Sequence, residues 1–301
     1  MRFKFFESHR AQSIKLSKQS NITDLTPDQI WSTRSFPVSG TGQDLRVECC
    51  SVRGSSHELQ NQPRQDAFEV DVLGSQLVVT VCDGVSNSRK SHLASKNLAK
   101  SSRNILGEVF DSQVTPQFDL WKIVNQNLTT ELVYSFMKDM KRSGIDYPLD
   151  SAELRLAAAQ EYASTFEVLL VELKPSSSGE HPFLYSRVAG DGTLMKISRK
   201  GLFNKKVWVD ITETPVSNLV DAIPVFDGDP LFMTGTLKKG ESLIVTTDGF
   251  AEALNHSKDV RRSLARRLNH IKKDESSAYL LMSKARTKSK DDLTFLTVSL
   301  K

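Results

Sequence analysis

Short apolar runs bounded by Gly, Asp and Ser recur along the chain from residue 45 onward. Their lengths and their content of β-branched residues are typical of β-strands. We predict strands at Leu45–Val52, Ala67–Val72, Gln76–Cys82, Thr165–Leu173, Pro182–Ala189, Leu194–Ile197, Val207–Ile211, Ser242–Thr247 and Leu293–Leu300.

Three further segments carry apolar residues at the spacing of an amphipathic helix. They are Ser86–Phe110, Trp121–Met140 and Lys258–Ile271. Strands therefore come first, followed by two long helices, more strands and a late helix. Because a doubly wound parallel sheet needs strands and helices to alternate regularly, this order predicts an antiparallel α+β architecture.

The first part of the chain has a different character. Residues 1–44 are polar, lack a periodic apolar pattern and end in the flexible sequence Ser39-Gly-Thr-Gly42. We predict that residues 1–44 form a partly irregular N-terminal extension and that residues 45–301 form one domain.

Composition places the chain among ordinary globular proteins. Of its 301 residues, 39% are hydrophobic and 25% are charged, which is enough apolar material to build a core. The net charge of +4 gives a weak field, so charge alone does not favour binding to nucleic acid or to a membrane. The longest uncharged run, residues 72–82, is far shorter than the roughly 20 apolar residues that cross a bilayer.

The cysteines indicate a reducing environment. Cys49, Cys50 and Cys82 are odd in number, two of them are adjacent, and they lack Cys-x-x-Cys spacing, so neither a disulfide framework nor a zinc site is expected. The N-terminus interleaves charges with Phe and does not read as a secretory signal. We therefore expect a cytoplasmic protein.

Acidic residues mark the ends of several predicted strands. Asp83, Asp191 and Asp248 each follow an apolar run and precede a Gly, and Asp291 opens the final strand. A single Asp-Gly is usually a turn, and spacing alone leaves a metal site and a set of ordinary turns equally open. If these carboxylates converge, their repulsion favours a bound cation, and an all-oxygen donor set suits Mg²⁺ or Mn²⁺ rather than Zn²⁺.

Seven short motifs, in order, carry a resemblance to a known family. They are Ser51-Val-Arg-Gly, Pro63-Arg-Gln-Asp-Ala-Phe, Val81-Cys-Asp-Gly, Ala163-Ser-Thr, Gly190-Asp-Gly, Thr247-Asp-Gly-Phe and Lys290-Asp-Asp-Leu-Thr. From about residue 46 to the end, the ordered set resembles the metal-dependent protein phosphatases of type 2C, and in particular bacterial members. The resemblance implies a central antiparallel β-sandwich flanked by helices, which agrees with the predicted order of elements.

The same resemblance implies two Mg²⁺ or Mn²⁺ ions and their ligands. Asp83 would bridge the two ions while the carbonyl of Gly84 completes the coordination of one, and Asp248 and Asp291 would hold the other. The neighbouring Asp292 is the alternative ligand if the register differs by one.

Further residues match the family at the edge of this site. Asp66 matches an acid that acts near the second metal, often through water, and Asp191 matches one linked to a third, weaker metal in bacterial relatives. Arg53 matches the arginine whose fork binds the substrate phosphate. Two ions about 3.5–4 Å apart can ionise a shared water and aim it at phosphorus, so no phosphoenzyme is needed.

Two positions depart from the animal members. Val85 stands where many of them carry the His proposed as proton donor, so we consider His57 and His92 as substitutes and favour His57, four residues beyond Arg53. Gln65 stands where the animal enzymes have an acid before Asp66. This change weakens the expected second metal site.

These observations favour a serine/threonine phosphoprotein phosphatase, expected to be a cytoplasmic monomer acting on the product of a serine/threonine kinase. Two alternatives stay open: a catalytically silent domain of the same fold that serves as a binding partner, and a two-metal nuclease, which the modest charge disfavours. The basic stretch from Lys258 to Arg267 is interpreted as a solvated helix face rather than a nucleic-acid patch. Residues 202–235, with three prolines, are expected to lie beside the site and to tune substrate choice.

Overall fold

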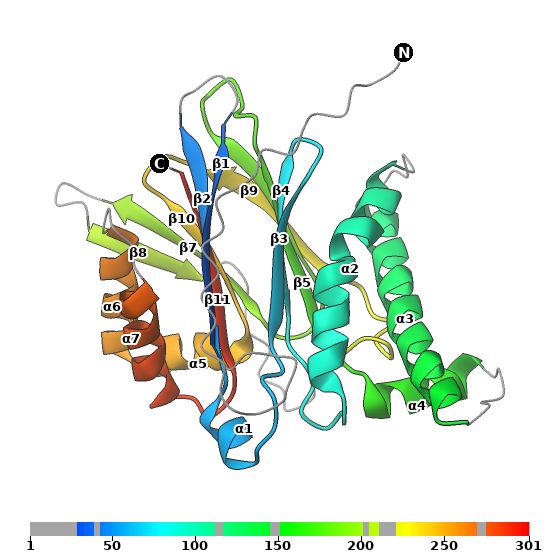
Figure 1. Ribbon diagram of the computed structural model, residues 1–301. Helices are drawn as coiled ribbons and strands as arrows, with labels where there is room; N and C mark the ends of the chain where they lie inside the picture. The colour runs from blue at the N-terminus through cyan, green and yellow to red at the C-terminus, as the bar shows by residue number, and fades with distance from the viewer. Residues whose placement is uncertain are drawn as a thin grey trace.

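The computed structural model describes residues 29–38, 43–111, 117–144, 151–200, 205–210, 221–269 and 275–300. Two antiparallel sheets lie face to face, and helices cover the outer side of each (Figure 1). This arrangement confirms the predicted α+β sandwich. None of the helices in these ranges is long and apolar enough to cross a lipid bilayer.

Strands from distant parts of the chain make up each sheet. The six-stranded sheet has the order β1 (Gln29–Pro37), β2 (Asp44–Val52), β11 (Leu293–Leu300), β10 (Ser242–Thr246), β7 (Thr193–Lys200) and β8 (Lys205–Asp210). The five-stranded sheet has the order β3 (Ala67–Leu73), β4 (Gln76–Cys82), β5 (Phe166–Glu172), β6 (His181–Ala189) and β9 (Leu231–Leu237).

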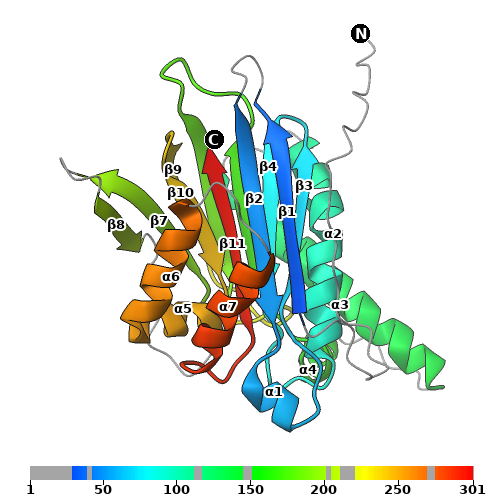
Figure 2. The ribbon, with the colours of Figure 1, turned by 60° about the vertical axis from the view of Figure 1, so that its left-hand side comes forward.

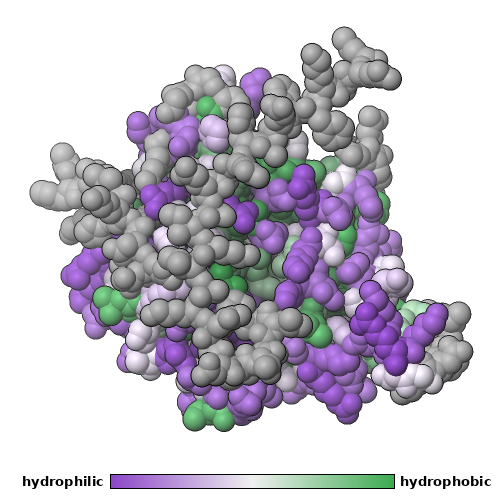
Figure 3. All heavy atoms as spheres, viewed as in Figure 1, coloured by the Kyte–Doolittle hydropathy of each residue, from purple (hydrophilic) through white to green (hydrophobic). Residues whose placement is uncertain are grey.

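The helices form two groups. The five-stranded sheet is covered by α2 (Ser91–Asp111), α3 (Gln117–Arg142) and α4 (Ser151–Glu161), and the six-stranded sheet by α5 (Asp248–His256), α6 (Lys258–Asn269) and α7 (Glu275–Arg286). The short helix α1 (Ser55–Leu59) lies at one end of the sandwich. Hydrophilic side chains dominate the outer surface over α2 and α3 in Figure 3, as expected for helices whose apolar side faces a sheet.

Alternation of side chains along the strands produces a layered core. In β4, Leu77, Val79 and Val81 face the other sheet, whereas Val78 and Cys82 face the helices. The same period of two runs through β5, β10 and β11, so both faces of the central strands are buried. These strands read as nearly continuous apolar runs for that reason, and all of them were predicted correctly.

The predicted extension contains a strand that the sequence analysis missed. β1 pairs with β2 along its whole length, from Gln29 opposite Val52 to Pro37 opposite Asp44, so the expected boundary at residues 44 and 45 falls within a hairpin. Trp31 and Phe36 are the large side chains of β1 in the core, too few to give an alternating pattern. The segment from residue 29 is therefore part of the sheet, and residues 1–28 lie outside the described ranges.

Other elements also escaped the pattern analysis. β9 begins within the segment 202–235, ends at Leu237 and forms one edge of the five-stranded sheet, with Leu231 and Phe232 partly exposed. The helices α1, α4, α5 and α7 were not predicted, because they are short and their apolar residues do not form long periodic stripes. The part of 202–235 proposed to tune substrate choice includes residues 211–220, which lie outside the described ranges.

All three cysteines are buried and unpaired. Burial raises the pKa of the Cys49 thiol to about 12, and it also raises the pKa of Cys50 and Cys82 well above the usual value. Cys49 and Cys50 lie in β2, between β1 and β11 in the six-stranded sheet, and Cys82 ends β4. The thiols are therefore packing residues in the folded chain.

One residue of the basic stretch on α6 contradicts the interpretation as a solvated face. Arg267 is buried and forms an ion pair with the buried carboxylate of Glu48 in β2. The indole Nε1 of Trp31 donates to the same carboxylate oxygen over 3.4 Å. This cluster holds α6 against β2 and β1. Moving α6 away would leave the buried charge of Glu48 without its partner, which is strongly unfavourable.

We expect Arg267→Ala to lower the free energy of unfolding by about 3–5 kcal/mol, since it leaves the Glu48 charge buried without its partner. The adjacent Arg266 is exposed, so Arg266→Ala serves as the matched control and should change stability by less than about 0.5 kcal/mol. Denaturant titration followed by circular dichroism measures both variants. Equal effects of the two substitutions would show that the ion pair does not anchor α6.

Candidate active site

The predicted acidic residues flank strand ends that meet at one end of the sandwich. In the six-stranded sheet, Thr246 pairs with both Thr193 and Phe295, which brings the residues just outside β10, β7 and β11 together. In the five-stranded sheet, Ala67 pairs with Cys82. This end of the sheets lies near α1 and α5 in both ribbon views (Figure 2).

The predicted ligands occupy these strand ends one by one. Asp83 follows β4, Asp66 precedes β3, and Asp191 stands between β6 and β7. Asp248 is the first residue of α5, two positions after the end of β10, and Asp291 stands two positions before β11. The register of both sheets thus places all five carboxylates in one region, although they come from positions more than 200 residues apart in the chain.

Backbone and hydroxyl contacts fix the position of Asp83. Its amide donates to Thr165 Oγ1 over 2.8 Å, and its carbonyl accepts hydrogen bonds from Thr165 N and Ser164 Oγ, both at 2.8 Å. The motif Ala163-Ser-Thr, which the resemblance picked out, therefore holds the main chain of the Asp83 turn. Gly84 fits tightly here, since a Cβ at this position would lie 2.8 Å from the backbone of Ser91.

Asp66 is held from the other sheet. Its side chain is 2% exposed, and Thr247 Oγ1 donates to its Oδ2 over 3.0 Å. The same hydroxyl accepts a hydrogen bond from Thr294 N at 3.2 Å. Among the described residues no donor reaches Oδ1 of Asp66, so one buried carboxylate oxygen is left with its lone pairs available.

Mutual repulsion and burial shift the pKa values of these acids upward. Burial, followed by the charge of Asp292, raises the pKa of Asp66 to about 7, and burial with the charges of Asp191 and Asp291 raises the pKa of Asp248 to about 7. The pKa of Asp83 lies well above its usual value because of burial and the nearby charges of Asp66 and Asp248.

Asp291 and Asp191 complete the charged group. Burial is the largest cause that raises the pKa of each, and the charge of Asp292 adds to it for Asp291, while the charge of Asp291 adds to it for Asp191. Every acid of the set is thus destabilised in its ionised form by its neighbours. A divalent cation would remove this cost.

The adjacent residues Asp291 and Asp292 have different surroundings. The Asp292 side chain is 1% exposed, and its carboxylate accepts hydrogen bonds from the amides of Gly54 and Gln65. The Asp291 side chain is 39% exposed and its charge acts on Asp83, Asp191 and Asp248. The carboxylate of Asp292 is therefore engaged in hydrogen bonds to the main chain, and Asp291 is the member of the pair that belongs to the acidic group.

His57 lies beneath this group on α1. Its imidazole is buried, with Nδ1 at 3.0 Å from Asp292 Oδ1 and 3.9 Å from Asp291 Oδ1. Burial acts to lower the pKa of His57, but the interaction with Asp292 and the charges of Asp291 and Asp66 outweigh it and raise the pKa above its usual value. His92, the other candidate, lies in the first turn of α2.

Arg53 stands between β2 and α1, close to the same end of the sheets. Most of its side chain is buried, and Nη1 donates to the carbonyl of Gln62 over 3.3 Å. Gly54, the next residue, packs directly on the main chain of Asp291, where a Cβ would lie 2.3 Å from the carbonyl carbon. The Arg53 loop and the Asp291 turn are therefore packed as one unit.

Sequence analysis missed one buried acid near the site. Glu167 in β5 points between the sheets, where Tyr185 OH donates to its Oε2 over 2.7 Å. Burial raises its pKa to about 8, against the hydrogen bond from Tyr185, and the charges of Asp191 and Asp248 contribute. A Glu at an inward position of the apolar run Phe166–Glu172 was the available signal.

The donor set fits a hard divalent cation. Five Asp carboxylates act on one another's pKa values at one end of the sandwich, Gly84 follows Asp83 directly, and carboxylate and carbonyl oxygens are the ligands that such a cation prefers. Among the residues that the structure describes, no three acidic, His or Cys side chains already form a ready-made metal site.

Comparisons with known proteins agree with this arrangement. The family model described as "Protein phosphatase 2C" matches residues 53–284. No curated protein matches the chain.

Solved structures match over most of the chain. The serine/threonine phosphatase Stp1 from Staphylococcus aureus is 15% identical with a TM-score of 0.57, over 88% of this chain and 98% of that one. PppA, described as a key regulatory component of the T6SS in Pseudomonas aeruginosa, is 17% identical with a TM-score of 0.52, over 85% and 98%. These likenesses show the fold, and the family model covers most of the sequence. The chain therefore belongs to the protein phosphatase 2C family.

Proposed function

We propose that this protein is a Mg²⁺- or Mn²⁺-dependent phosphatase that hydrolyses phosphoserine and phosphothreonine in proteins. The observation that carries the proposal is the convergence of five Asp side chains, each with a raised pKa, at one end of the sandwich. A silent domain has no need to hold such a costly group together. The family assignment supports the same activity.

The metal ligands in this proposal are those that the sequence predicted. Asp83 would bridge two ions, the carbonyl of Gly84 would complete one of them, and Asp248 and Asp291 would hold the other. Asp66 would act near the second ion through its free oxygen, and Asp191 would serve a third, weaker site. When bound, the ions would supply Lewis-acid activation of the attacking water and would neutralise charge on the phosphoryl oxygens.

The remaining residues of the site would orient the substrate and move a proton. Arg53 would hold the substrate phosphate with its guanidinium fork, since it stands on the loop that packs on the Asp291 turn. His57 would donate the proton to the leaving alkoxide, because it lies beside Asp291 and its pKa favours the charged form. Thr165, Ser164 and Thr247 keep the acids in place.

The setting of the activity is part of the proposal. We infer a phosphorylated protein substrate, produced by a serine/threonine kinase, and a monomeric enzyme in the cytoplasm, where three unpaired cysteines are compatible with the redox conditions.

The decisive experiment measures hydrolysis of a phosphoserine peptide. We expect activity with Mn²⁺ or Mg²⁺, none in excess EDTA, and recovery when metal is restored. Asp83→Asn and Asp291→Asn should lower kcat at least about 100-fold. Replacing a residue that only hydrogen-bonds to a metal ligand already lowers metal affinity or activity by about 10–100-fold, and loss of the ligand itself should cost more. Full activity in EDTA would exclude the proposed mechanism. If the protein is inactive with both Mn²⁺ and Mg²⁺, the silent domain is favoured instead.

Asp292→Asn is the matched control for Asp291→Asn. It should lower the free energy of unfolding by about 1–3 kcal/mol. The two carboxylate oxygens of Asp292 accept hydrogen bonds from the amides of Gly54 and Gln65, whereas an Asn side chain has one oxygen and leaves one amide without its acceptor. Asp291→Asn should not lower the stability of the metal-free protein. If Asp291→Asn keeps full activity while a folded Asp292→Asn protein is inactive, the register of the ligands is wrong by one.

The raised pKa values also predict how stability depends on pH. The pKa of Asp66 and of Asp248 is about 7 in the folded chain and 3.8 in the unfolded chain. Between these pH values the folded state therefore binds more protons than the unfolded state. The metal-free protein should therefore lose stability as pH rises from about 4 to 8. Asp248→Asn removes part of this cost and should raise the melting temperature in EDTA at pH 8 but not at pH 4.

Thermal denaturation at several pH values, with and without Mn²⁺, measures this effect. The exposed Asp227 provides the control, since Asp227→Asn should behave as wild type at every pH. With Mn²⁺ the order should reverse, because Asp248→Asn loses a ligand. A melting temperature of the wild type in EDTA that rises steadily to pH 8 would contradict the repulsion described for this site.

The proton donor can be tested through the leaving group. A serine alkoxide needs protonation as it leaves, whereas p-nitrophenolate does not, so His57→Ala should slow phosphopeptide hydrolysis by about 10–100-fold and spare p-nitrophenyl phosphate. His256→Ala, at an exposed position, is the control. Equal losses on both substrates would instead assign His57 to positioning Asp291 and Asp292.

A further inference from the structure

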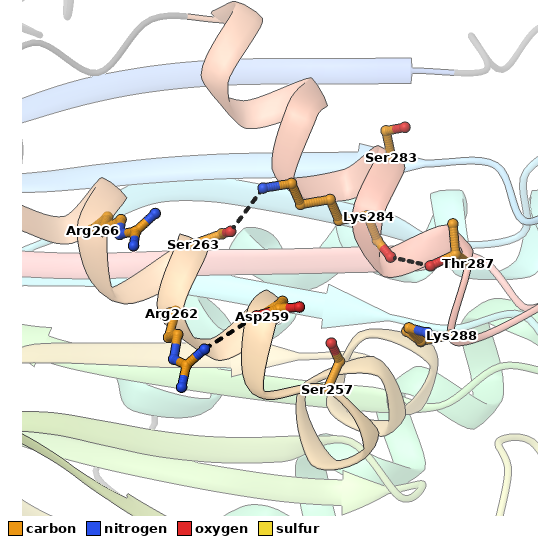
Figure 4. A pocket seen from close by; sticks show the side chains of 9 residues that line it. All are labelled: Ser257, Asp259, Arg262, Ser263, Arg266, Ser283, Lys284, Thr287 and Lys288. Atoms are coloured by element: carbon orange, nitrogen blue, oxygen red, sulfur yellow. Dashed lines mark hydrogen bonds and ion pairs between the residues drawn. The ribbon is translucent and has the colours of Figure 1, made fainter.

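A polar cavity lies between α6 and α7, on the outer side of the six-stranded sheet (Figure 4). Its volume is about 390 Å³. The lining residues are Ser257, Asp259, Arg262, Ser263, Arg266, Ser283, Lys284, Thr287 and Lys288. None of them belongs to the acidic group proposed for catalysis, so the cavity is a separate site.

Helical periodicity explains how the cavity becomes basic. Arg262 and Arg266 are four residues apart on one face of α6, while Arg267 turns inward to Glu48. Lys284 and Lys288 are also four residues apart, at the C-terminal end of α7 and just beyond it. Ser263 of α6 faces Lys284 of α7, and its small side chain leaves space between the two basic rows.

Positive charge in the cavity exceeds negative charge. Four cationic side chains face one carboxylate, Asp259, which pairs with Arg262 over 3.4 Å. Lys284 Nζ donates a hydrogen bond to a neutral group, the hydroxyl Oγ of Ser263, at 3.3 Å. Within the described ranges, no carboxylate pairs with the side chains of Arg266 or Lys288. The cavity therefore holds cationic groups that a bound anion would neutralise.

The chemistry of the lining selects the kind of anion. Guanidinium and ammonium groups donate hydrogen bonds in several directions, and the hydroxyls of Ser257 and Thr287 add further donors. A phosphomonoester dianion accepts many charge-assisted hydrogen bonds and suits guanidinium groups in particular. The lining contains no aromatic side chain on which a base would stack, which argues against single-stranded nucleic acid.

We propose that the cavity between α6 and α7 binds a phosphate dianion, either as free inorganic phosphate or as a phosphoryl group carried by a peptide. Arg266 and Lys288 stand at its two ends (Figure 4) and supply positive charge that no described carboxylate neutralises, and Lys284 and Thr287 also line it. This binding does not depend on the proposed hydrolysis, because the site shares no residue with the catalytic group.

Nuclear magnetic resonance titration of the full chain with inorganic phosphate tests the proposal. Metal is removed with EDTA and Arg53 is replaced by Ala, which takes away phosphate binding at the catalytic site. We expect the amide resonances of Thr287 and Lys288 to shift with saturation. The double variant Arg266→Ala/Lys288→Ala, in the same background, should bind at least about tenfold more weakly.

A matched control and a second probe complete the experiment. Lys138 on α3 is exposed and distant in the fold, so Lys138→Ala should leave the affinity unchanged. A phosphoserine peptide and its unphosphorylated counterpart identify the source: shifts with phosphate alone support a free anion, and equal shifts with the phosphopeptide support a protein-borne group. The proposal is overturned if phosphate leaves Thr287 and Lys288 unshifted, or if the double variant binds phosphate as well as its parent.

Discussion

The repulsion among five carboxylates is the constraint on which the rest of this structure depends. Burial is the largest cause of each raised pKa, and the charges of the neighbouring acids add to it. The chain tolerates this because the buried central strands fix the strand ends and because hydroxyl groups hold Asp83 and Asp66 in place. The stability of the core thus offsets the unfavourable free energy of holding these carboxylates close together, which a bound metal ion would reduce.

Asp292 shows how that framework works at one residue. It contacts the Arg53 loop through Gly54, the Asp66 segment through Gln65, and α1 through His57, while its neighbour Asp291 belongs to the acidic group. A single buried carboxylate near the C-terminal end of the chain therefore fixes three parts of the segment 53–66 relative to the Asp291 turn. Recognition of phosphate by Arg53 and binding of metal by Asp291 would share this support.

The sequence predicted best where burial is strongest. Central strands such as β4 and β11 are buried on both faces, so their apolar runs were unmistakable, and the ordered motifs located the acids because each stands at a strand end. Peripheral elements were harder, since β1 relies on few large side chains such as Trp31. Contacts such as Arg267 with Glu48, across 219 residues, follow from packing and leave no local pattern. The distinction between Asp291 and Asp292 likewise depends on amides donated from another segment.

Burial makes the three cysteine thiols of the folded chain slow to react, which could not be predicted from the sequence alone. A thiol reacts with alkylating agents and peroxide as the thiolate, and the pKa of Cys49, near 12, leaves almost none at neutral pH. Cys49 and Cys50 are buried in β2 and are reached only when the six-stranded sheet opens, whereas Cys82, in the five-stranded sheet, directly precedes Asp83. The rate of thiol labelling therefore records opening of the sandwich, with separate reporters in its two sheets.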